Sequence, residues 1–277
     1  MNGLTENLYR TLSALPQEDV SAQGESLVDA VWAQARRCLA GKASGPGVSA
    51  GGRLVATDLA GGLIPVESAA FNNTLRYAGL QVTTESASAA AQRVCCAVPV
   101  FAAMALAEAR GADCARLFRA AGLGVEAYTR LAGSLADGTR KKGFDAHVIA
   151  ATLGAIVACA FIEQLPSGKA AQALGLGSSS VTGVMHGYLP LQAATAARDG
   201  IVMALLMTCE FRGPPDPIAC RWGVYETFGD LQDVGTLDVA SSTMKSTGDV
   251  RQLSGKSALG TGLRGAVSVR QYLDGFV

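Results

Sequence analysis

The sequence has few charged residues and no excess of either sign. Only 17% of its 277 residues are charged, and 23 Lys and Arg balance 23 Asp and Glu, so the formal net charge is zero. Because 49% of the residues are hydrophobic, the chain can bury enough surface to offset its entropy, which excludes an intrinsically disordered protein. The balanced charge argues against a nucleic-acid partner, since it provides no net release of counterions from phosphates.

Aromatic residues are also scarce, at 6% of the chain, whereas glycine is abundant, with 33 residues. A β-sandwich depends on β-branched and aromatic side chains, so this composition disfavours that architecture. Small side chains instead allow helices to approach one another closely. The composition therefore predicts an all-α, closely packed protein.

The chain lacks the usual signals of secretion and of a membrane span. Its first ten residues do not have the basic-then-apolar order of a signal peptide. The longest uncharged apolar stretch, residues 148–162, is shorter than the ~20 residues that cross a bilayer. The seven cysteines include no C-x-x-C pair, a pattern typical of buried thiols in a reducing compartment. We therefore expect a soluble, cytoplasmic protein with no membrane partner.

Histidine is rare as well, because the chain has only His147 and His186, 39 residues apart. Two such residues cannot build a histidine-rich metal site. Residues 260–265 (GTGLRG) match the G-x-G-x-x-G pattern, but the twelve residues that follow are too few for the helix and acidic residue of a dinucleotide site. The sequence therefore predicts neither a metal ion nor an organic cofactor.

Apolar residues recur at helical spacing along most of the chain. The spacing predicts helices over residues 27–41, 68–77, 99–110, 113–121, 125–133, 147–164, 167–174 and 191–209. Pro99 suits the start of its helix, where a missing N–H costs nothing. After residue 230 the chain is rich in Ser, Gly and Thr, and residues 266–273 alternate as a strand would. We therefore expect a helical domain over residues 1–230 and a short C-terminal remnant over residues 231–277.

Six segments, taken in order and spacing, resemble the MmgE/PrpD family, which includes 2-methylcitrate dehydratase, cis-aconitate decarboxylase and iminodisuccinate epimerase. The segments are LPQEDV (15–20), AEARG (107–111), KGF (142–144), AAQALGLGSSSVTGVM (170–185), AARDGIVMALL (196–206) and GPPDPIACRWGVYETFGD (213–230). They correspond to the large all-helical domain of the family over roughly residues 6–230. The resemblance implies a shortened, divergent member with a short irregular tail in place of the family's α+β lid domain.

The resemblance also implies chemistry that needs no cofactor. Family members remove a proton next to a carboxylate and then expel water, lose CO₂ or reprotonate on the other face. Such a reaction needs a base beside the acidic carbon and cationic or hydrogen-bonding groups that hold carboxylates. The implied activity is that of a lyase of the dehydratase type, or an isomerase, acting on a carboxylated small molecule in a specialised biosynthetic pathway. A non-catalytic binding or stabilising protein on the same scaffold is the alternative.

The segments that carry the family's catalytic residues are largely changed in this sequence. The DDTH-like segment falls on residues 82–85 (VTTE), GFHPT falls on residues 143–147 (GFDAH), and the K-x-L-H-A-G-like segment falls on residues 189–194 (LPLQAA). Asp145 thus stands where the family has a histidine, and a histidine follows two places later. Because the family's lysine and histidines are replaced, we expect a larger, mostly apolar acid as the substrate in preference to a tricarboxylate.

Three residues are candidates for catalysis. His147 is expected to begin the helix that lines the family's pocket, where a helix N-terminus favours the neutral imidazole that a general base requires. A hydrogen-bonded structural histidine is the alternative. Asp145 can act as a base or cap the following helix, and His186 lies in a glycine-bounded loop facing the segment of the family's lysine. In an enzyme, all three side chains should face one cavity.

Other residues are candidates for binding the substrate. Thr84 and Glu85 lie in the changed DDTH-like segment, and Tyr188 can donate a hydrogen bond from the loop of His186. Lys141 and Lys142, together with Arg140, form a basic run that can attract a carboxylate, although a solvated loop has the same pattern. Family members are commonly dimers through the helical domain, and the apolar composition predicts a homodimer here too.

Overall fold

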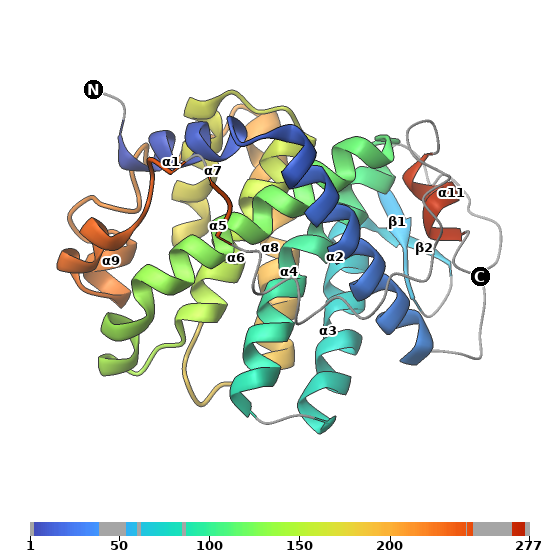
Figure 1. Ribbon diagram of the computed structural model, residues 1–277, viewed down its shortest axis with the longest axis horizontal. Coiled ribbons are helices and arrows are strands. Elements are labelled where there is room, and N and C mark those ends of the chain that lie inside the picture. Colours follow the sequence, from blue (N-terminus) through green and yellow to red (C-terminus); the bar gives the residue numbers. More distant parts are fainter. Residues whose placement is uncertain are drawn as a thin grey trace.

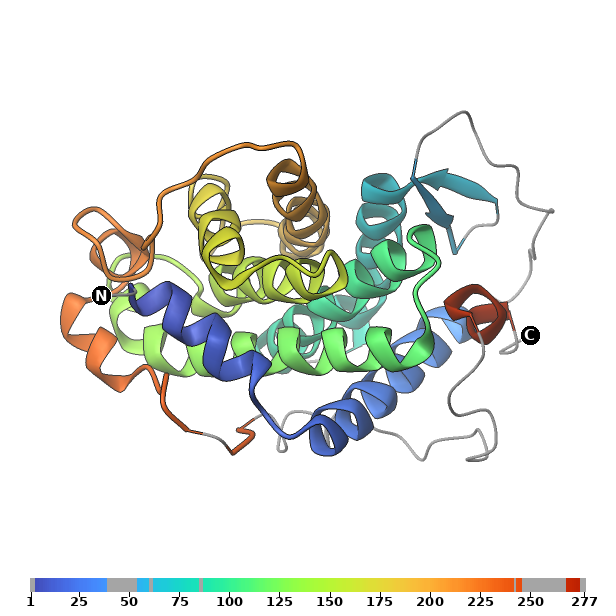
Figure 2. The same ribbon diagram turned by 90° about the horizontal axis from the view of Figure 1, so that it is seen from above.

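Helices make up most of the described chain, and several of them pack around one buried helix, α6 (Figure 1, Figure 2). The computed structural model describes residues 3–38, 54–59, 62–84, 87–241, 243–245 and 268–274. The helices are α1 (Leu4–Ser13), α2 (Gln17–Cys38), α3 (Val66–Thr84), α4 (Ala87–Ala109), α5 (Cys114–Lys141), α6 (Ala146–Ile162), α7 (Ser167–Ser178), α8 (Leu189–Thr208), α9 (Val224–Phe228), the 3-10 helix η1 (Leu231–Thr236) and α11 (Val269–Asp274). Two short strands, β1 (Val55–Thr57) and β2 (Leu63–Pro65), pair antiparallel with Ala56 opposite Ile64. The all-α prediction is confirmed.

Helix α6 is buried because it has no polar face. Fifteen of its 17 residues are buried, and α4, α5, α7 and α8 pack around it. A helix that is apolar on every side is stable only when neighbours cover it completely. The apolar run of residues 148–162 that the sequence analysis singled out is therefore the centre of the fold.

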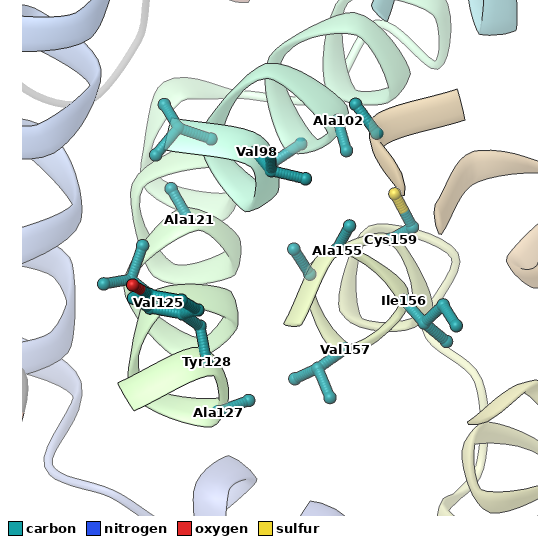
Figure 3. Close-up of a cluster of buried hydrophobic side chains, with 14 of the residues drawn as sticks. Val98, Ala102, Ala121, Val125, Ala127, Tyr128, Ala155, Ile156, Val157 and Cys159 are labelled. Atoms are coloured by element: carbon teal, nitrogen blue, oxygen red, sulfur yellow. The ribbon is translucent and has the colours of Figure 1, made fainter. Parts of the chain in front are cut away.

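Helices α4, α5 and α6 cross at a point formed by Pro99, Gly124 and Gly154. A Cβ atom added at Gly124 would lie 2.8 Å from the Cβ atoms of both Pro99 and Ala158 and 2.9 Å from the Gly154 carbonyl oxygen. Figure 3 shows the buried cluster around this crossing, with Val98 from α4 and other side chains from α5 and α6. The glycines allow the three backbones to approach far more closely than larger residues would.

This crossing explains why the predicted start of a helix at Pro99 is wrong. Helix α4 begins at Ala87 and continues through Pro99 to Ala109. A proline inside a helix removes one hydrogen bond and usually breaks the helix. Here the proline ring packs against Gly124 and Gly154, and burial of the whole segment outweighs the lost bond.

Two further predictions of local structure are wrong for related reasons. The predicted helices 113–121 and 125–133 form the single helix α5, because Gly122 and Gly124 serve close packing; a Cβ at Gly122 would lie 2.4 Å from the Val20 carbonyl oxygen. Residues 269–274 form α11 instead of a strand, with Val269 and Leu273 buried on one helical face. The glycine-rich residues 260–265 lie outside the described part of the chain.

The segment after η1 is held on the helical body by a buried ion pair in α5. Arg130 Nε donates to Glu126 Oε1 at 2.8 Å, and both side chains are fully buried. The Arg130 guanidinium also donates to the carbonyl oxygens of Asp238, Ser241 and Thr243 at 2.9 to 3.2 Å. The Lys245 N–H donates to both Glu126 carboxylate oxygens at 2.9 Å. Residues 238–241 and 243–245 thus contact the helical body through the polar groups of this ion pair, and the Thr11 hydroxyl also donates to the Val239 carbonyl oxygen.

One described helical segment, residues 90–109 of α4, is long and apolar enough to cross a membrane. In its 18-residue window, 89% of the residues are buried inside the protein. Core helices of this kind commonly pass the same test of length and composition.

Candidate functional site

A cavity of about 560 Å³ lies at one end of the helical body. The last turns of α3 and α5 and the first turns of α4, α6 and α8 meet around it, together with the loops that precede α6 and α8. Its lining is formed by Val82, Ala91, Ala136, Thr139, Arg140, Phe144, Asp145, Ala146, His147, Met185, Gly187, Leu189 and Gln192. The volume is in the range typical of small-molecule sites.

His147 is held at this cavity by a tyrosine that the sequence analysis did not select. The Tyr128 hydroxyl lies 2.9 Å from His147 Nδ1, and the same hydroxyl lies 3.4 Å from the Gln92 carbonyl oxygen. Tyr128 is 1% exposed and lies on α5, whereas His147 lines the cavity at the start of α6. The tyrosine therefore fixes the orientation of the imidazole from the buried side.

This arrangement accommodates both neutral forms of His147. When the Nδ1–H donates to the tyrosine oxygen and the hydroxyl donates to Gln92, Nε2 has a free lone pair and can accept a proton. When the hydroxyl donates to Nδ1, Nε2 carries a proton that it can donate. The pair can thus serve as a base or as an acid without moving a heavy atom.

Asp145 also lines the cavity and caps α6. Its Oδ1 atom accepts the backbone N–H of His147 at 2.8 Å, which is the capping role that the sequence left open beside catalysis. Burial raises the pKa of the Cys95 thiol well above its usual range, and the negative charge of Asp145 raises that pKa further. Cys95 is therefore a neutral thiol near the site and a poor nucleophile.

The basic run at the end of α5 divides into three different environments. Arg140 is exposed but lines the cavity, and no described residue forms an ion pair or a hydrogen bond with its guanidinium. Lys142 Nζ instead donates to the Glu226 carbonyl oxygen at 2.7 Å, near the end of α9, and Lys141 is exposed. Neither lysine is part of the lining. Of the three, Arg140 is the cation available to a bound anion.

The loop before α8 forms one side of the cavity but directs its polar side chains elsewhere. It is tied to the loop before α6, because the Asp145 N–H donates to the Gly183 carbonyl at 2.7 Å and the Met185 N–H donates to the Gly143 carbonyl at 3.0 Å. Met185 and Gly187 line the cavity, whereas His186 and Tyr188 are exposed and do not. The structure thus brings Asp145 and His147 to one cavity and leaves His186 outside its lining.

The remaining sequence candidates lie at the edge of the described structure. The backbone of Thr84 ends α3, but its side chain and the whole of Glu85 lie outside the described residues. Among the described residues, no group of three or more His, Cys, Asp or Glu side chains is placed to hold a metal ion. The described lining residues provide one imidazole, one carboxylate, one guanidinium and two uncharged polar side chains, Thr139 and Gln192.

Tyr128 could not be recognised from the sequence, because it lies within the apolar pattern of a helix and 19 residues from its partner. Arg140 was part of a recognised basic run, and only the direction of each side chain distinguishes it from the two lysines.

Comparison with models of protein families identifies the family of the chain. The family model "MmgE/PrpD N-terminal domain" matches residues 30–236, well over half of the chain. A search of curated proteins finds no match.

Proposed function

Because the chain belongs to the MmgE/PrpD family, we propose that it is a cofactor-independent enzyme that removes a proton next to a substrate carboxylate. The observation that carries the proposal is the position of His147, which lines the cavity while its Nδ1 atom lies 2.9 Å from the Tyr128 hydroxyl. A base held in one orientation beside a bound acid satisfies the first requirement of this chemistry. The proposed base is His147 Nε2.

The negative charge that forms on proton removal needs stabilisation. When the proton leaves the carbon next to a carboxylate, its bonding electrons move into that carboxylate, which becomes more negative. Arg140 provides a full positive charge at the cavity, and the N-termini of α6 and α8 provide partial positive charges. In this assignment Arg140 binds the substrate carboxylate and the developing charge.

The proposed outcome is a dehydration. Protonated His147 returns the proton to a hydroxyl group on the neighbouring carbon, the C–O bond breaks, and water leaves as the C=C bond forms. The imidazole ends the cycle neutral, so no external acid, base or oxidant is consumed. If a water molecule instead protonates the opposite face of the carbon and His147 releases its proton to solvent, the reaction is an isomerisation with the same first step.

Deuterium exchange tests the shared first step. The protein is incubated in D₂O with 3-hydroxybutanoate, 3-hydroxyoctanoate or citrate, and NMR follows loss of the proton signal next to the carboxylate together with any alkene product. We expect exchange or dehydration of at least one acid by the wild-type protein. We expect His147→Ala to lower that rate by at least about a hundredfold, the usual contribution of a general base.

His186→Ala is the matched control, because it removes the other histidine of the chain from an exposed position outside the cavity lining. We expect it to leave the rate unchanged. An unchanged rate in His147→Ala would overturn the assignment of the base. A wild-type protein that binds these acids but exchanges none of them would favour the non-catalytic alternative over the enzyme.

A further inference from the structure

We infer that the cavity takes a carboxylic acid with one negative charge and an apolar body, in preference to a di- or tricarboxylate. The inference names the substrate class of the site described above and so rests on the proposed function for its chemical meaning. It is carried by the number of charges at the cavity, by the apolar lining and by the exposed apolar residues beside it.

The charges of the lining match a single carboxylate. Among the described lining residues, Arg140 is the one Lys or Arg, and Asp145 is the one Asp or Glu. A first carboxylate can pair with the guanidinium. A second or third carboxylate would gain no cation among the described lining residues and would be repelled by Asp145. Lys142 does not provide a second cation, because its ammonium group is hydrogen-bonded to the Glu226 carbonyl oxygen in α9.

Most of the lining is apolar. Seven side chains of this kind come from five helices and the two loops: Val82, Ala91, Ala136, Phe144, Ala146, Met185 and Leu189. The Phe144 ring is fixed by an edge-to-face contact with Phe228, with ring centroids 5.0 Å apart. A fixed apolar wall offers a binding surface for hydrocarbon and few hydrogen-bond donors for further oxygen atoms.

The apolar surface continues outside the cavity along the loop before α8 and the first turn of that helix. Val184, Met185, Tyr188 and Leu191 are 57%, 41%, 65% and 49% exposed. Exposed apolar residues that gather beside a cavity commonly mark the continuation of a binding groove. Because Met185 belongs both to this surface and to the lining, we assign the surface to the far end of the apolar body.

Calorimetric titration of the full chain with butanoate, octanoate and citrate at constant ionic strength tests the inference. Each buried methylene should tighten binding about fourfold, so octanoate, with four more methylenes, should bind roughly 250-fold more tightly than butanoate. Citrate should bind more weakly than octanoate. Arg140→Gln should weaken octanoate binding about tenfold, because it removes a charge-assisted hydrogen bond.

Matched variants separate the two parts of the recognition. Lys141→Gln removes a neighbouring exposed cation outside the lining and should leave octanoate binding unchanged. Met185→Ser should weaken octanoate binding and spare butanoate, whereas Phe211→Ser, at an exposed apolar residue outside the lining, should affect neither. Thermal unfolding verifies that each variant is folded, as expected for exposed positions.

Tighter binding of citrate than of octanoate would overturn the inference, as would an Arg140→Gln variant with unchanged affinity. If Met185→Ser changes the sedimentation coefficient of the protein but not octanoate binding, the exposed apolar surface is a contact between two copies of the chain. The assignment of this surface to the apolar body of the ligand then fails. The proposed function fails separately: octanoate binding that depends on Arg140, without proton exchange in any acid, supports the ligand class and overturns catalysis. If citrate exchanges its proton in a reaction that depends on His147 and octanoate does not bind, the proposed catalysis is supported and the ligand class is overturned.

Discussion

At the scale of single residues, the contact between Tyr128 and His147 gives the cavity its chemistry. A histidine on the surface of a helix samples several ring orientations and both neutral tautomers. The hydroxyl 2.9 Å from Nδ1 restricts the ring and links its tautomer to the hydroxyl proton. In the proposed mechanism Tyr128 is a positioning residue, because it would act on the substrate only through His147.

Tyr128→Phe tests this role, because phenylalanine fills almost the same space without the hydroxyl. We expect the exchange rate to fall about tenfold, less than for His147→Ala, because the base remains but loses its fixed tautomer. The ¹⁵N spectrum of the histidine side chains gives a second readout that folding alone does not explain. The Nδ1 and Nε2 signals of His147 should shift, whereas those of exposed His186 should stay in place and serve as an internal reference. Unchanged His147 signals would contradict the positioning role.

At the scale of secondary-structure elements, the crossing of α4, α5 and α6 determines where the functional side chains lie. Gly124 is one helical turn before Tyr128 on α5, and Gly154 is two turns after His147 on α6. A Cβ atom at Gly154 would lie only 2.6 Å from the Gly124 carbonyl oxygen and 3.1 Å from the Tyr128 Cβ atom. The close contact of the two backbones therefore brings the hydroxyl within reach of the imidazole.

Gly124→Ala tests the crossing. We expect it to lower the free energy of unfolding by about 1 to 3 kcal/mol, because the new methyl group would overlap Pro99, Ala158 and the Gly154 carbonyl. Gly133→Ala is the matched control in the same helix, since a Cβ atom there meets nothing within 4 Å. That change should raise stability by roughly 0.5 to 1 kcal/mol through the higher helix propensity of alanine. Urea unfolding measures both values, and equal effects of the two changes would contradict the role of close packing.

At the scale of the whole molecule, the buried pair of Glu126 and Arg130 connects the segment after η1 to the helical body. The Arg130 guanidinium donates to the backbone carbonyl oxygens of three residues in this segment, Asp238, Ser241 and Thr243, and the Glu126 carboxylate accepts the backbone N–H of Lys245. A salt bridge between Lys245 and Asp238 closes the segment at 3.0 Å. Its hydrogen bond lowers the pKa of the Asp238 carboxyl to about 2. Local charges thus hold a segment that contributes few buried apolar side chains.

Arg130→Ala should destabilise the protein by about 3 to 5 kcal/mol, because it leaves the Glu126 carboxylate buried without its cation. The control is Arg10→Ala in α1, which breaks a largely exposed pair with Glu6 and should cost less than about 1 kcal/mol. Urea unfolding gives the two free energies, and limited trypsin digestion reports release of the segment through faster cleavage after Lys245. A loss of less than about 1 kcal/mol for Arg130→Ala would contradict the role of the buried ion pair in holding the segment after η1.

Local sequence patterns were sufficient for the helical class of this protein and for the burial of α6, and they offered the cap that Asp145 forms as one of two roles for that residue. Each of these depends on neighbours within a few turns, because helix periodicity, apolar content and capping are short-range properties. The resemblance to the MmgE/PrpD family is confirmed by the family match over residues 30–236.

The remaining features depend on contacts between distant segments. Pro99 lies inside a helix, and the glycines of α5 do not end that helix, because the packing of three helices outweighs local preference at these positions. The pairing of Tyr128 with His147 and the choice of Arg140 over the adjacent lysines as the cavity's cation arise in the same way. Local periodicity indicates which face of a helix is buried. Which side chains share a cavity is set by where the helices cross, and here the crossing depends on small residues far apart in the chain.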